Sequence, residues 1–365
     1  MPTTNTVENY IQIITQDVPI LDVRAETEFN DGAIPGSVNI PILNDEERRV
    51  VGICYKQNGK EAALDLGLKI VCGENKNEKL ERWKQFFKKY PHAYLTCYRG
   101  GLRSQITQQW LAENNIVVPR LLNGYKGFRA WAIQQIDIES QNAKVKVVSG
   151  TTGSGKTHFL RQCPQKIHII DLEKQANHRG SAFGSLGLQP SQADFEHRVL
   201  KEFLTVSARA GKTDQSILIE DESRLIGQRA LPLGVFNMIR SSSILLLEEP
   251  LESRVEHIFD NYVNSPIEPH EVTLGRYIQS TASISKKLGI ERTKEIINDI
   301  QACRVLIPGC VSPAGQTEFK FENFKWIEKL LVWYYDPMYL GSLQKRNPRI
   351  EFRGTRVQLK DYLRC

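Results

Sequence analysis

The residues best suited to chemistry lie in the loop 97–104, which reads Cys-Tyr-Arg-Gly-Gly-Leu-Arg-Ser. The apolar run 93–96 predicts a strand before this loop, and residues 106–112 follow a helical pattern after it. Two glycines let the loop turn its backbone N–H groups inward and two arginines add positive charge, so the loop is suited to bind an anion. These surroundings favour thiolate over thiol, and Cys97 is therefore predicted to be a nucleophile. The residues expected to bind the anion are Arg99, Gly100, Gly101, Arg103 and Ser104.

A second loop predicts phosphate binding. Residues 145–149 have the pattern of a strand, and the next eight residues read Gly-Thr-Thr-Gly-Ser-Gly-Lys-Thr before a helical start, which is the P-loop pattern in its strand–loop–helix context. Its glycines allow the backbone N–H groups to surround a phosphate, Lys156 reaches the outer oxygens and Thr157 can hold Mg²⁺. The candidate phosphate-binding residues are Gly150, Thr151, Gly153, Ser154, Gly155, Lys156 and Thr157.

Acidic side chains are predicted beside the P-loop. Apolar strands end at Asp171 and at the triplet 220–222, and ligands in open parallel sheets bind beyond the carboxyl ends of the strands. We therefore expect Asp171, Glu220 and Glu222 to lie near Lys156, where an acid can orient Mg²⁺ or an attacking group. The alternation of the strand breaks down at its end, so the sequence leaves open which acid of the triplet faces the site.

Two polar segments each permit two interpretations. Residues 177–184 include His178 and Arg179 among small residues, a composition suited to holding a second anion or a nucleotide. An ordinary surface loop accounts for the same residues equally well. The mixed-charge segment 44–57 is typical of a solvated helix face, with Lys56 as a candidate contact to an anion.

Strands and helices alternate along the chain, which is typical of α/β proteins with parallel sheets. Strand patterns lie at 20–24, 93–96, 120–122, 145–149, 167–170, 217–219 and 244–247, and residues 32–41 are predicted to form a turn that leads into a further strand. A helix is expected from Ser191 or Asp194 to about Ala210. We predict an α/β domain with a parallel sheet around the cysteine loop, then a doubly wound α/β domain around the P-loop. The expected bounds are 8–136 for the first domain, 137–144 for a linker, 145–312 for the P-loop domain and 313–365 for a C-terminal aromatic and basic segment.

The composition is that of a soluble globular protein, expected in the cytoplasm. Charged residues make up 25% and hydrophobic residues 41% of the 365 residues, and no apolar run reaches the roughly 18 residues of a membrane span. The N-terminus has no basic region followed by an apolar one, so neither a leader peptide nor membrane association is expected. Seven cysteines without a Cys-x-x-Cys pair favour a reducing compartment over a disulfide framework or a zinc site. We predict no bound metal other than Mg²⁺ at the P-loop, and no tightly bound cofactor.

Positive charge is concentrated near the C-terminus. The net charge is +6, and residues 345–364 contain seven basic residues against Glu351 and Asp361, a net charge of +5. Residues 326–339, beside them, contain five aromatic side chains. One interpretation is an RNA partner, bound by the cations and by rings stacked on unpaired bases; the alternative is a solvated tail beside a helical core. The candidate RNA-binding residues are Arg346, Arg349, Arg353 and Arg356.

The first part of the chain resembles the rhodanese family. The resemblance rests on the strand Leu-Asp-Val-Arg at 21–24, the segment Ile-Pro-Gly-Ser-Val-Asn-Ile-Pro at 34–41, the cysteine loop, and a glycine turn before an aromatic-rich helix. Rhodaneses carry sulfur or selenium on the cysteine of this loop. The resemblance therefore implies that Cys97 is a persulfide or perselenide carrier.

The loop departs from single-domain rhodaneses in its length. Arg103 follows Cys97 by six positions, where those proteins usually have five. Related phosphatases and arsenate reductases use the longer loop to hold a tetrahedral oxyanion, although they usually carry a histidine at the position of Thr96. A wider loop suits selenophosphate equally well, so a phosphatase stays open as an alternative to a selenium carrier.

The chain as a whole resembles the tRNA 2-selenouridine synthase family. Besides the two loops, the resemblance rests on the segments 51–57, 177–184 and 222–227. It implies a transferase that replaces the sulfur of 2-thiouridine at the tRNA wobble position with selenium, through an S-geranyl intermediate. The implied co-substrates are geranyl diphosphate, bound at the P-loop, and selenophosphate, whose selenium Cys97 takes. The implied partners are a tRNA with a thiolated anticodon and an enzyme that supplies selenophosphate.

Two other classes of function stay open. One is a rhodanese-like phosphatase or sulfurtransferase fused to an NTP-dependent kinase-like domain, both acting on small molecules. The other is a regulatory module in which the cysteine domain senses anions and the P-loop domain acts as a switch. RNA binding separates the first class from a tRNA-modifying transferase, and turnover that depends on Cys97 separates the second.

Overall fold

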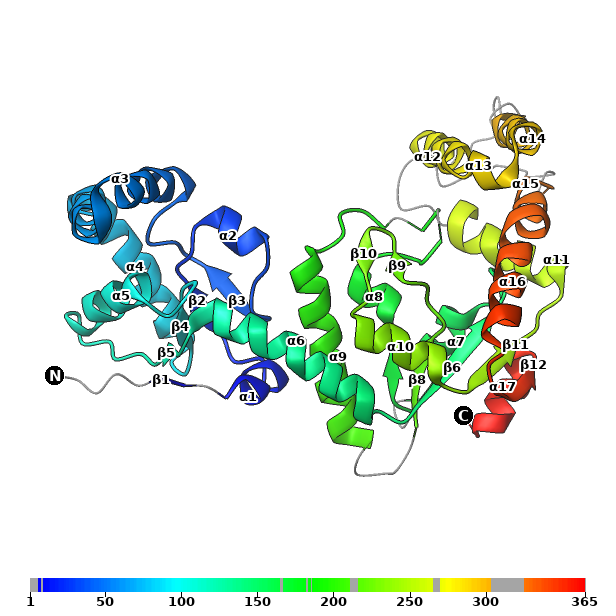
Figure 1. Ribbon diagram of the computed structural model, residues 1–365, viewed down its shortest axis with the longest axis horizontal. Helices are drawn as coiled ribbons and strands as arrows, with labels where there is room; N and C mark the ends of the chain where they lie inside the picture. Colours follow the sequence, from blue (N-terminus) through cyan, green and yellow to red (C-terminus); the bar gives the residue numbers. More distant parts are fainter. Residues whose placement is uncertain are drawn as a thin grey trace, which may run out of the picture. The chain divides into compact units, whose positions relative to one another are not determined.

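The computed structural model describes residues 6–7, 9–164, 167–181, 183–184, 186–210, 216–264, 270–302 and 325–364. Its contacts divide the chain into two compact units, coloured along the sequence in Figure 1. Unit 1 comprises Met1–Gln141 with Pro190–Ala208, and unit 2 comprises Asn142–Gln189 with Arg209–Cys365. Each unit is built around a five-stranded sheet whose strands pair in parallel, which confirms the predicted α/β fold class. The predicted domain boundary at 312 lies outside the described residues.

The sheet of unit 1 has the strand order β1-β5-β4-β2-β3. Its strands are β1 (Thr6–Val7), β2 (Ile20–Asp22), β3 (Ser37–Asn39), β4 (Tyr94–Thr96) and β5 (Arg120–Leu121). The central strands β2 and β4 pair with Leu21 opposite Leu95, and both side chains are fully buried. Burial of these apolar runs fixes the sheet, and the carboxyl end of β4 delivers Cys97.

Seven helices among the described residues belong to unit 1. They are α1 (Tyr10–Thr15), α2 (Glu26–Asn30), α3 (Asp45–Ile70), α4 (Gly73–Lys89), α5 (Leu102–Ala112), α6 (Gly124–Asn142) and α9 (Gln192–Ala210). Helix α3 begins with a capping box, in which Asn44 and Glu47 each accept the backbone N–H of the other. It is broken at Gly59, whose φ of +86° is a conformation that favours glycine. The mixed-charge helix expected from the sequence is therefore present, with a bend at Gly59.

The predicted linker 137–144 is mostly helical, because α6 continues through Asn142. Helix α9 also departs from the predicted domain bounds, since all of it up to Ala208 belongs to unit 1. His197 of α9 is fully buried, and burial and the charge of Arg129 lower its pKa to about 3, so the imidazole is neutral. Its Nδ1 lies 2.8 Å from the carbonyl oxygen of Ala33 and donates a hydrogen bond to it. These contacts explain why a segment inside the P-loop sequence belongs to the other unit.

The sheet of unit 2 has the strand order β12-β11-β6-β8-β7. Its strands are β6 (Val145–Gly150), β7 (Ile169–Ile170), β8 (Ile217–Glu220), β11 (Ile244–Leu247) and β12 (Ile350–Gly354), and a separate two-stranded ribbon joins β9 (Leu225–Ile226) to β10 (Arg229–Ala230). The last strand, β12, comes from the segment expected to be a separate basic tail. Because β12 pairs with β11 at the edge of the sheet, that segment is part of the P-loop fold.

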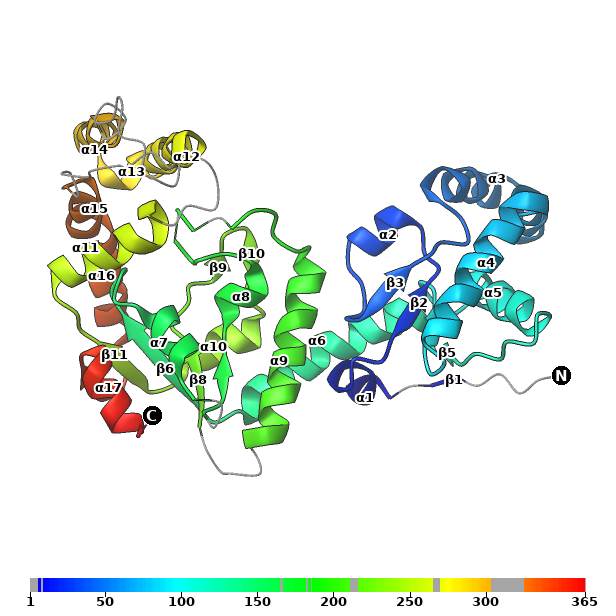
Figure 2. The ribbon, with the colours of Figure 1, turned by 180° about the vertical axis from the view of Figure 1, so that it is seen from behind.

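The helices of unit 2 fall into two groups. Those next to the sheet are α7 (Lys156–Gln162), α8 (Leu172–Ala176), α10 (Leu233–Ser241), α16 (Asp336–Arg346) and α17 (Arg356–Leu363). The others form what we call the helical cap: α11 (Leu251–Ile258), η1 (Phe259–Asn264), α12 (His270–Ser283), α13 (Ser285–Leu288), α14 (Ile290–Ala302), α15 (Lys325–Leu330) and η2 (Leu331–Tyr335). In Figures 1 and 2, α12, α13 and α14 lie together, apart from the strands and beside α15. The cap has its own hydrophobic core, which includes Tyr277, Ile296 and Trp326.

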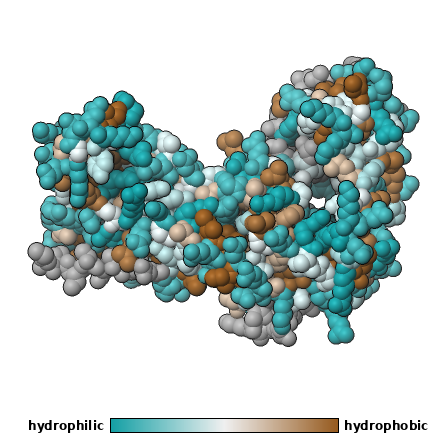
Figure 3. Space-filling model, in the orientation of Figure 1, coloured by the Kyte–Doolittle hydropathy of each residue, from teal (hydrophilic) through white to brown (hydrophobic). Residues whose placement is uncertain are grey.

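Hydrophilic residues cover most of the face drawn in Figure 3. Among the described residues, no helix has both the length and the apolar character needed to span a bilayer.

Candidate functional site

The cysteine loop joins β4 to α5 as the sequence predicts. Gly100 has a φ of +64°, and a side chain there would place a Cβ atom 2.8 Å from the carbonyl oxygen of Leu121. Glycine is therefore required at this point of the turn. The turn is held from outside by the backbone N–H of Tyr125, which donates to the carbonyl oxygen of Cys97 at 2.9 Å.

The sulfur of Cys97 lies at the floor of an open cavity of ≈ 1150 Å³. The residue is only 3% exposed, so a reactant reaches its sulfur only through this cavity. Cys97 Sγ lies 3.2 Å from Ser104 Oγ, and that hydroxyl donates to the carbonyl oxygen of Gly101 at 3.0 Å. Ser104 therefore orients the thiol, and a reactant can approach the sulfur from the cavity.

Positive charge surrounds the cavity. Arg103 is fixed by Glu28, with Nη2 and Oε1 3.1 Å apart. Burial disfavours the charge of Arg103, but the hydrogen bonds and the negative charge of Glu28 outweigh it and hold the pKa of Arg103 above its usual value. Arg99 is exposed at the cavity entrance. The other cations that line the cavity are Arg24, Arg48, Arg49, Lys56 and Lys60, so Lys56 does face the sulfur's cavity.

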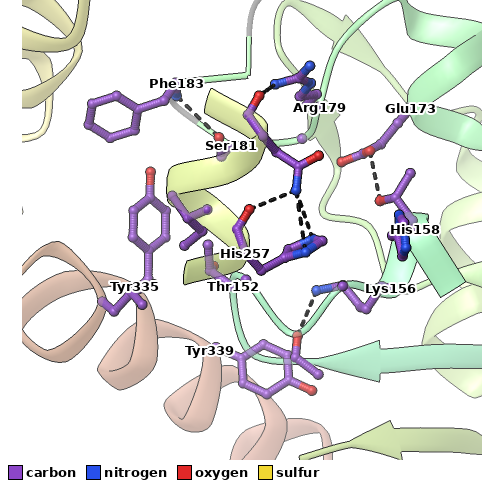
Figure 4. Close-up of a pocket in the computed structure, with 18 of the residues that line it drawn as sticks. Thr152, Lys156, His158, Glu173, Arg179, Ser181, Phe183, His257, Tyr335 and Tyr339 are labelled. Carbon is purple, nitrogen blue, oxygen red and sulfur yellow. Dashed lines mark hydrogen bonds between the residues drawn. The ribbon is translucent and has the colours of Figure 1, made fainter. Parts of the chain in front are cut away.

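The P-loop joins β6 to α7, and its glycines take the conformations that the motif needs. Gly153 and Gly155 have φ of +83° and +74°, and a Cβ at Gly153 would lie 2.8 Å from Ile258 Cδ1. Lys156 Nζ donates to the carbonyl oxygens of Gly150, at 2.8 Å, and Thr151, at 3.4 Å. The lysine thus folds over the loop at the position from which it can contact a bound phosphate (Figure 4).

Three glutamates gather beside the P-loop. Ligand oxygens of Glu173, Glu220 and Glu222 lie within 4.8 Å of one another, and Thr157 Oγ1 donates to Glu173 Oε2 at 2.9 Å. Neither carboxylate oxygen of Glu220 has a hydrogen-bond partner in the part of the chain that the structure describes, although the residue is 1% exposed. Burial and the neighbouring carboxylates raise the pKa of Glu222 to about 8 and that of Glu220 well above its usual value. Three crowded, buried carboxylates next to a P-loop threonine form a donor set that fits Mg²⁺.

The three acids predicted from the sequence differ in their surroundings: two belong to the glutamate cluster, and one stabilises a helix. Glu222 lines the P-loop pocket and Glu220 lies behind it in the cluster. Asp171 has a structural part, since it caps α8 through the N–H of Lys174 and pairs with Arg161, both at 2.8 Å. Glu173, the second residue of α8, is not among the acids predicted from the sequence. Its position two residues after a strand-end acid is the signal that could have found it.

The segment 177–184 contributes the side chains of Arg179, Ser181 and Phe183 to the pocket. Arg179 lines it, and its Nη1 donates to the carbonyl oxygen of Asn261 at 2.7 Å (Figure 4). His178 is buried instead, and its Nδ1 accepts the backbone N–H of Gly180 at 3.1 Å. Arg179 therefore fits the predicted anion clamp, whereas His178 shapes the loop.

The four arginines predicted to bind RNA also separate into two pairs. Arg346 is buried and bound to Asp221 at 2.8 Å, and Arg356 pairs with Glu249 at 3.1 Å while it packs against Gly155. The prediction is thus wrong for Arg346, because a buried ion pair joins it to the end of β8. Arg349 and Arg353 are exposed; Arg353 also forms an exposed ion pair with Glu248 at 3.5 Å, which a polyanion would have to displace.

Two family models together match nearly the whole chain. The model of the rhodanese-like domain matches residues 6–133, and that of the tRNA 2-selenouridine synthase AAA domain matches residues 143–365. The fold and the two sites therefore define a class of protein in which a rhodanese-like domain with a cysteine loop is joined to a P-loop domain.

Relatives match almost from end to end. A tRNA 2-selenouridine synthase of Bdellovibrio bacteriovorus is 41% identical, with 96% of each chain covered. Those of Nitrosomonas europaea and Alcanivorax borkumensis are 39% and 40% identical, covering 98% and 97% of this chain and 98% of each relative. The chain belongs to the tRNA 2-selenouridine synthase family.

Proposed function

We propose that this chain is a transferase that replaces the sulfur of 2-thiouridine at the tRNA wobble position with selenium, through an S-geranyl intermediate. The observation that carries the proposal is that one chain, similar from end to end to proteins named for this activity, holds a cysteine in a cationic cavity and a phosphate-binding loop. Its co-substrates are geranyl diphosphate and selenophosphate.

The P-loop is the site of the geranyl step. The sulfur of 2-thiouridine attacks C1 of geranyl diphosphate, the C–O bond breaks, and diphosphate leaves with the electron pair. The loop N–H groups and Lys156 stabilise the charge that develops on that leaving group. Alkylation matters for the next step, because a thiocarbonyl sulfur is a poor leaving group and a geranylthiolate is a better one.

The cysteine loop is the site of the selenium step. Arg99, Arg103 and the loop N–H groups bind the phosphate part of selenophosphate, and the Cys97 thiolate attacks its selenium. The S–Se bond that forms makes a perselenide, and the Se–P bond breaks with its electron pair on phosphorus, which leaves as phosphite. The perselenide selenium then attacks C2 of the uridine, and geranylthiolate departs. A small-molecule thiol, the co-reactant of the last step, then attacks the Cys97 sulfur: a disulfide forms, the S–Se bond breaks with its electron pair on selenium, and 2-selenouridine is released. A second thiol reduces the disulfide and restores Cys97.

A single reaction tests this function. Thiolated tRNA, geranyl diphosphate, selenophosphate and a small-molecule thiol are incubated with the protein. The nucleosides are analysed by mass spectrometry, and the phosphorus product is identified by ³¹P NMR. We expect S-geranyl-thiouridine, then selenouridine, with phosphite released. No modified nucleoside would overturn the proposal, and phosphate in place of phosphite would mean that Cys97 does not carry selenium.

Mg²⁺ is proposed at the P-loop, held by Thr157 and by Glu173, Glu220 and Glu222. An acid whose pKa is raised in the folded protein stabilises it below the unfolded pKa of about 4.5, and this stabilisation is lost as the pH rises through the folded pKa, about 8 for Glu222. Mg²⁺ at 100-fold excess over its Kd is expected to raise Tm by about 5 °C at pH 8.5 and by less at pH 6.

Differential scanning calorimetry of Glu222→Gln measures this effect. The variant should gain Tm at pH 8.5 without metal and should lose the Mg²⁺ shift. Glu291→Gln, on the exposed face of α14, is the matched control and should behave as the parent protein. An unchanged Mg²⁺ shift in Glu222→Gln would place the ion elsewhere.

Arg349 and Arg353 are the proposed contacts to the tRNA backbone. Replacing both with alanine should reduce the slope of log affinity against log salt by about 2, because each phosphate contact releases about one counterion. Filter binding of tRNA across a salt series measures the slope. The double variant Lys286→Ala/Lys287→Ala removes the same charge from α13, and an equal slope change there would mean that only net charge matters.

A further inference from the structure

The P-loop pocket has a second wall that the phosphate chemistry does not use. The pocket has a volume of ≈ 360 Å³, and the helical cap closes the side facing the P-loop. In Figure 4, Phe183 and Tyr335 lie on one side of the pocket, and Lys156 and Glu173 on the other. The apolar side chains of this wall are Phe183, Ile258, Tyr277, Trp326, Leu330 and Leu331.

This wall adjoins the P-loop through helix α11. Ile258 approaches Gly153 so closely that a Cβ there would lie 2.8 Å from its Cδ1. Arg254, from the same helix α11, donates to the carbonyl oxygen of Thr152 at 3.1 Å and is paired with Asp336 at 2.7 Å. A ligand held by the loop would therefore meet the apolar wall directly, without crossing a polar gap.

The polar side chains near this wall are largely engaged with the protein itself. Arg179 donates to the backbone of Asn261, Asn261 donates to the backbone of His257, and Ser181 accepts the N–H of Phe183. A nucleoside presents several hydrogen-bonding edges that need free partners, and their loss on burial is costly. A hydrocarbon chain needs only apolar surface, which the cap core supplies.

We propose that the pocket holds an amphiphile whose diphosphate lies on the P-loop and whose short isoprenoid chain lies against the cap wall. The wall is thus the determinant of chain length, a role that rests on the proposed geranyl step. A pocket of this size, with apolar and aromatic side chains on one side and the P-loop with its charged neighbours on the other, is typical of a small-ligand site. Because Ile258 adjoins the P-loop, it contacts the carbons nearest the diphosphate.

Isothermal titration calorimetry of the full chain, with Mg²⁺, tests the proposal. Its probes are inorganic diphosphate, geranyl diphosphate, dimethylallyl diphosphate and ADP. Geranyl diphosphate is expected to bind about 100-fold more tightly than inorganic diphosphate, with dimethylallyl diphosphate in between, since each apolar group in a fitted pocket adds affinity. The half-buried residues Ile258 and Tyr335 give the test variants Ile258→Asn and Tyr335→Ser.

These variants should lose most of the advantage of geranyl diphosphate while their affinity for inorganic diphosphate stays within twofold of the parent. Val272→Asn, which changes an exposed residue of the cap, is the control and should bind as the parent does. Circular dichroism confirms that each variant is folded, and unchanged diphosphate binding shows that the P-loop is intact.

The outcomes separate the wall from the P-loop. Equal affinity of the parent protein for geranyl and inorganic diphosphate would overturn the chain-binding wall and leave the P-loop proposal standing. Tighter binding of ADP, weakened by the same variants, would assign the wall to a nucleoside and overturn the isoprenoid. If no diphosphate compound binds, the proposed geranyl step fails as well.

Discussion

Replacing Cys97 with serine is expected to stop selenium incorporation while S-geranyl-tRNA still forms and accumulates. The thiolate is the proposed selenium acceptor, and a serine hydroxyl in the same place is a far weaker nucleophile at neutral pH. Loss of a nucleophile typically costs at least about three orders of magnitude in rate. Ser104 already places one hydroxyl 3.2 Å from the sulfur, so a second hydroxyl fits the site without distorting it.

Nucleoside mass spectrometry of tRNA after reaction measures both products at once. Cys72→Ser is the matched control, because Cys72 is exposed and lies outside the lining of the cavity. It should make selenouridine at the parental rate. Full selenation by Cys97→Ser would remove Cys97 from the reaction, and loss of geranylation in the same variant would mean that the two steps are not separate.

The sequence predicts the two loops well because each is local. Cys97 and Lys156 follow directly from short buried strands, and the glycines beside them are needed for turns that the chain makes within a few residues. Strand–loop–helix order alone therefore locates both loops in the fold. The sequence does not predict Glu173 as a site residue, because the direction of its side chain depends on how α8 packs. Its contact with Thr157, sixteen residues away in the sequence, forms only in the folded unit.

Long-range pairing accounts for the predictions that were wrong or incomplete. The sequence places Arg346 in a basic C-terminal segment, whereas in the fold it forms an ion pair with Asp221, which lies 125 residues earlier in the chain. Helix α9 is held in unit 1 by the contact of His197 with Ala33, 164 residues apart. Neither composition nor periodicity reports such contacts. The role of the basic segment and the bounds of the P-loop domain therefore cannot be predicted from local sequence patterns alone.

The aromatic segment 326–339 illustrates a different limit. Its residues fit a helical core and a surface for stacking bases equally well by sequence. In the fold, Trp326 is 5% exposed within the cap core, while Tyr335 and Tyr339 line the P-loop pocket. The segment therefore forms a wall of the P-loop pocket, which the sequence does not indicate.

Replacing Lys156 with alanine is expected to block the geranyl step and to leave the selenium step intact on tRNA that is already geranylated. Removing one preorganised group that stabilises a leaving anion typically costs about 10²- to 10³-fold in rate. The rate of S-geranyl-thiouridine formation, followed by nucleoside mass spectrometry, measures the loss. Lys287→Ala, at an exposed position of α13, is the control and should react as the parent protein does.

Supplying chemically geranylated tRNA isolates the second step in Lys156→Ala, and selenouridine should then form at the parental rate. Normal geranylation by Lys156→Ala would show that the P-loop does not take part in the reaction.

A mixture of the Lys156→Ala and Cys97→Ser proteins contains one intact site of each kind, on separate chains. If S-geranyl-tRNA leaves the first site freely, the mixture makes selenouridine; if the uridine passes between sites within one molecule, the mixture accumulates S-geranyl-tRNA, because no single chain can complete both steps.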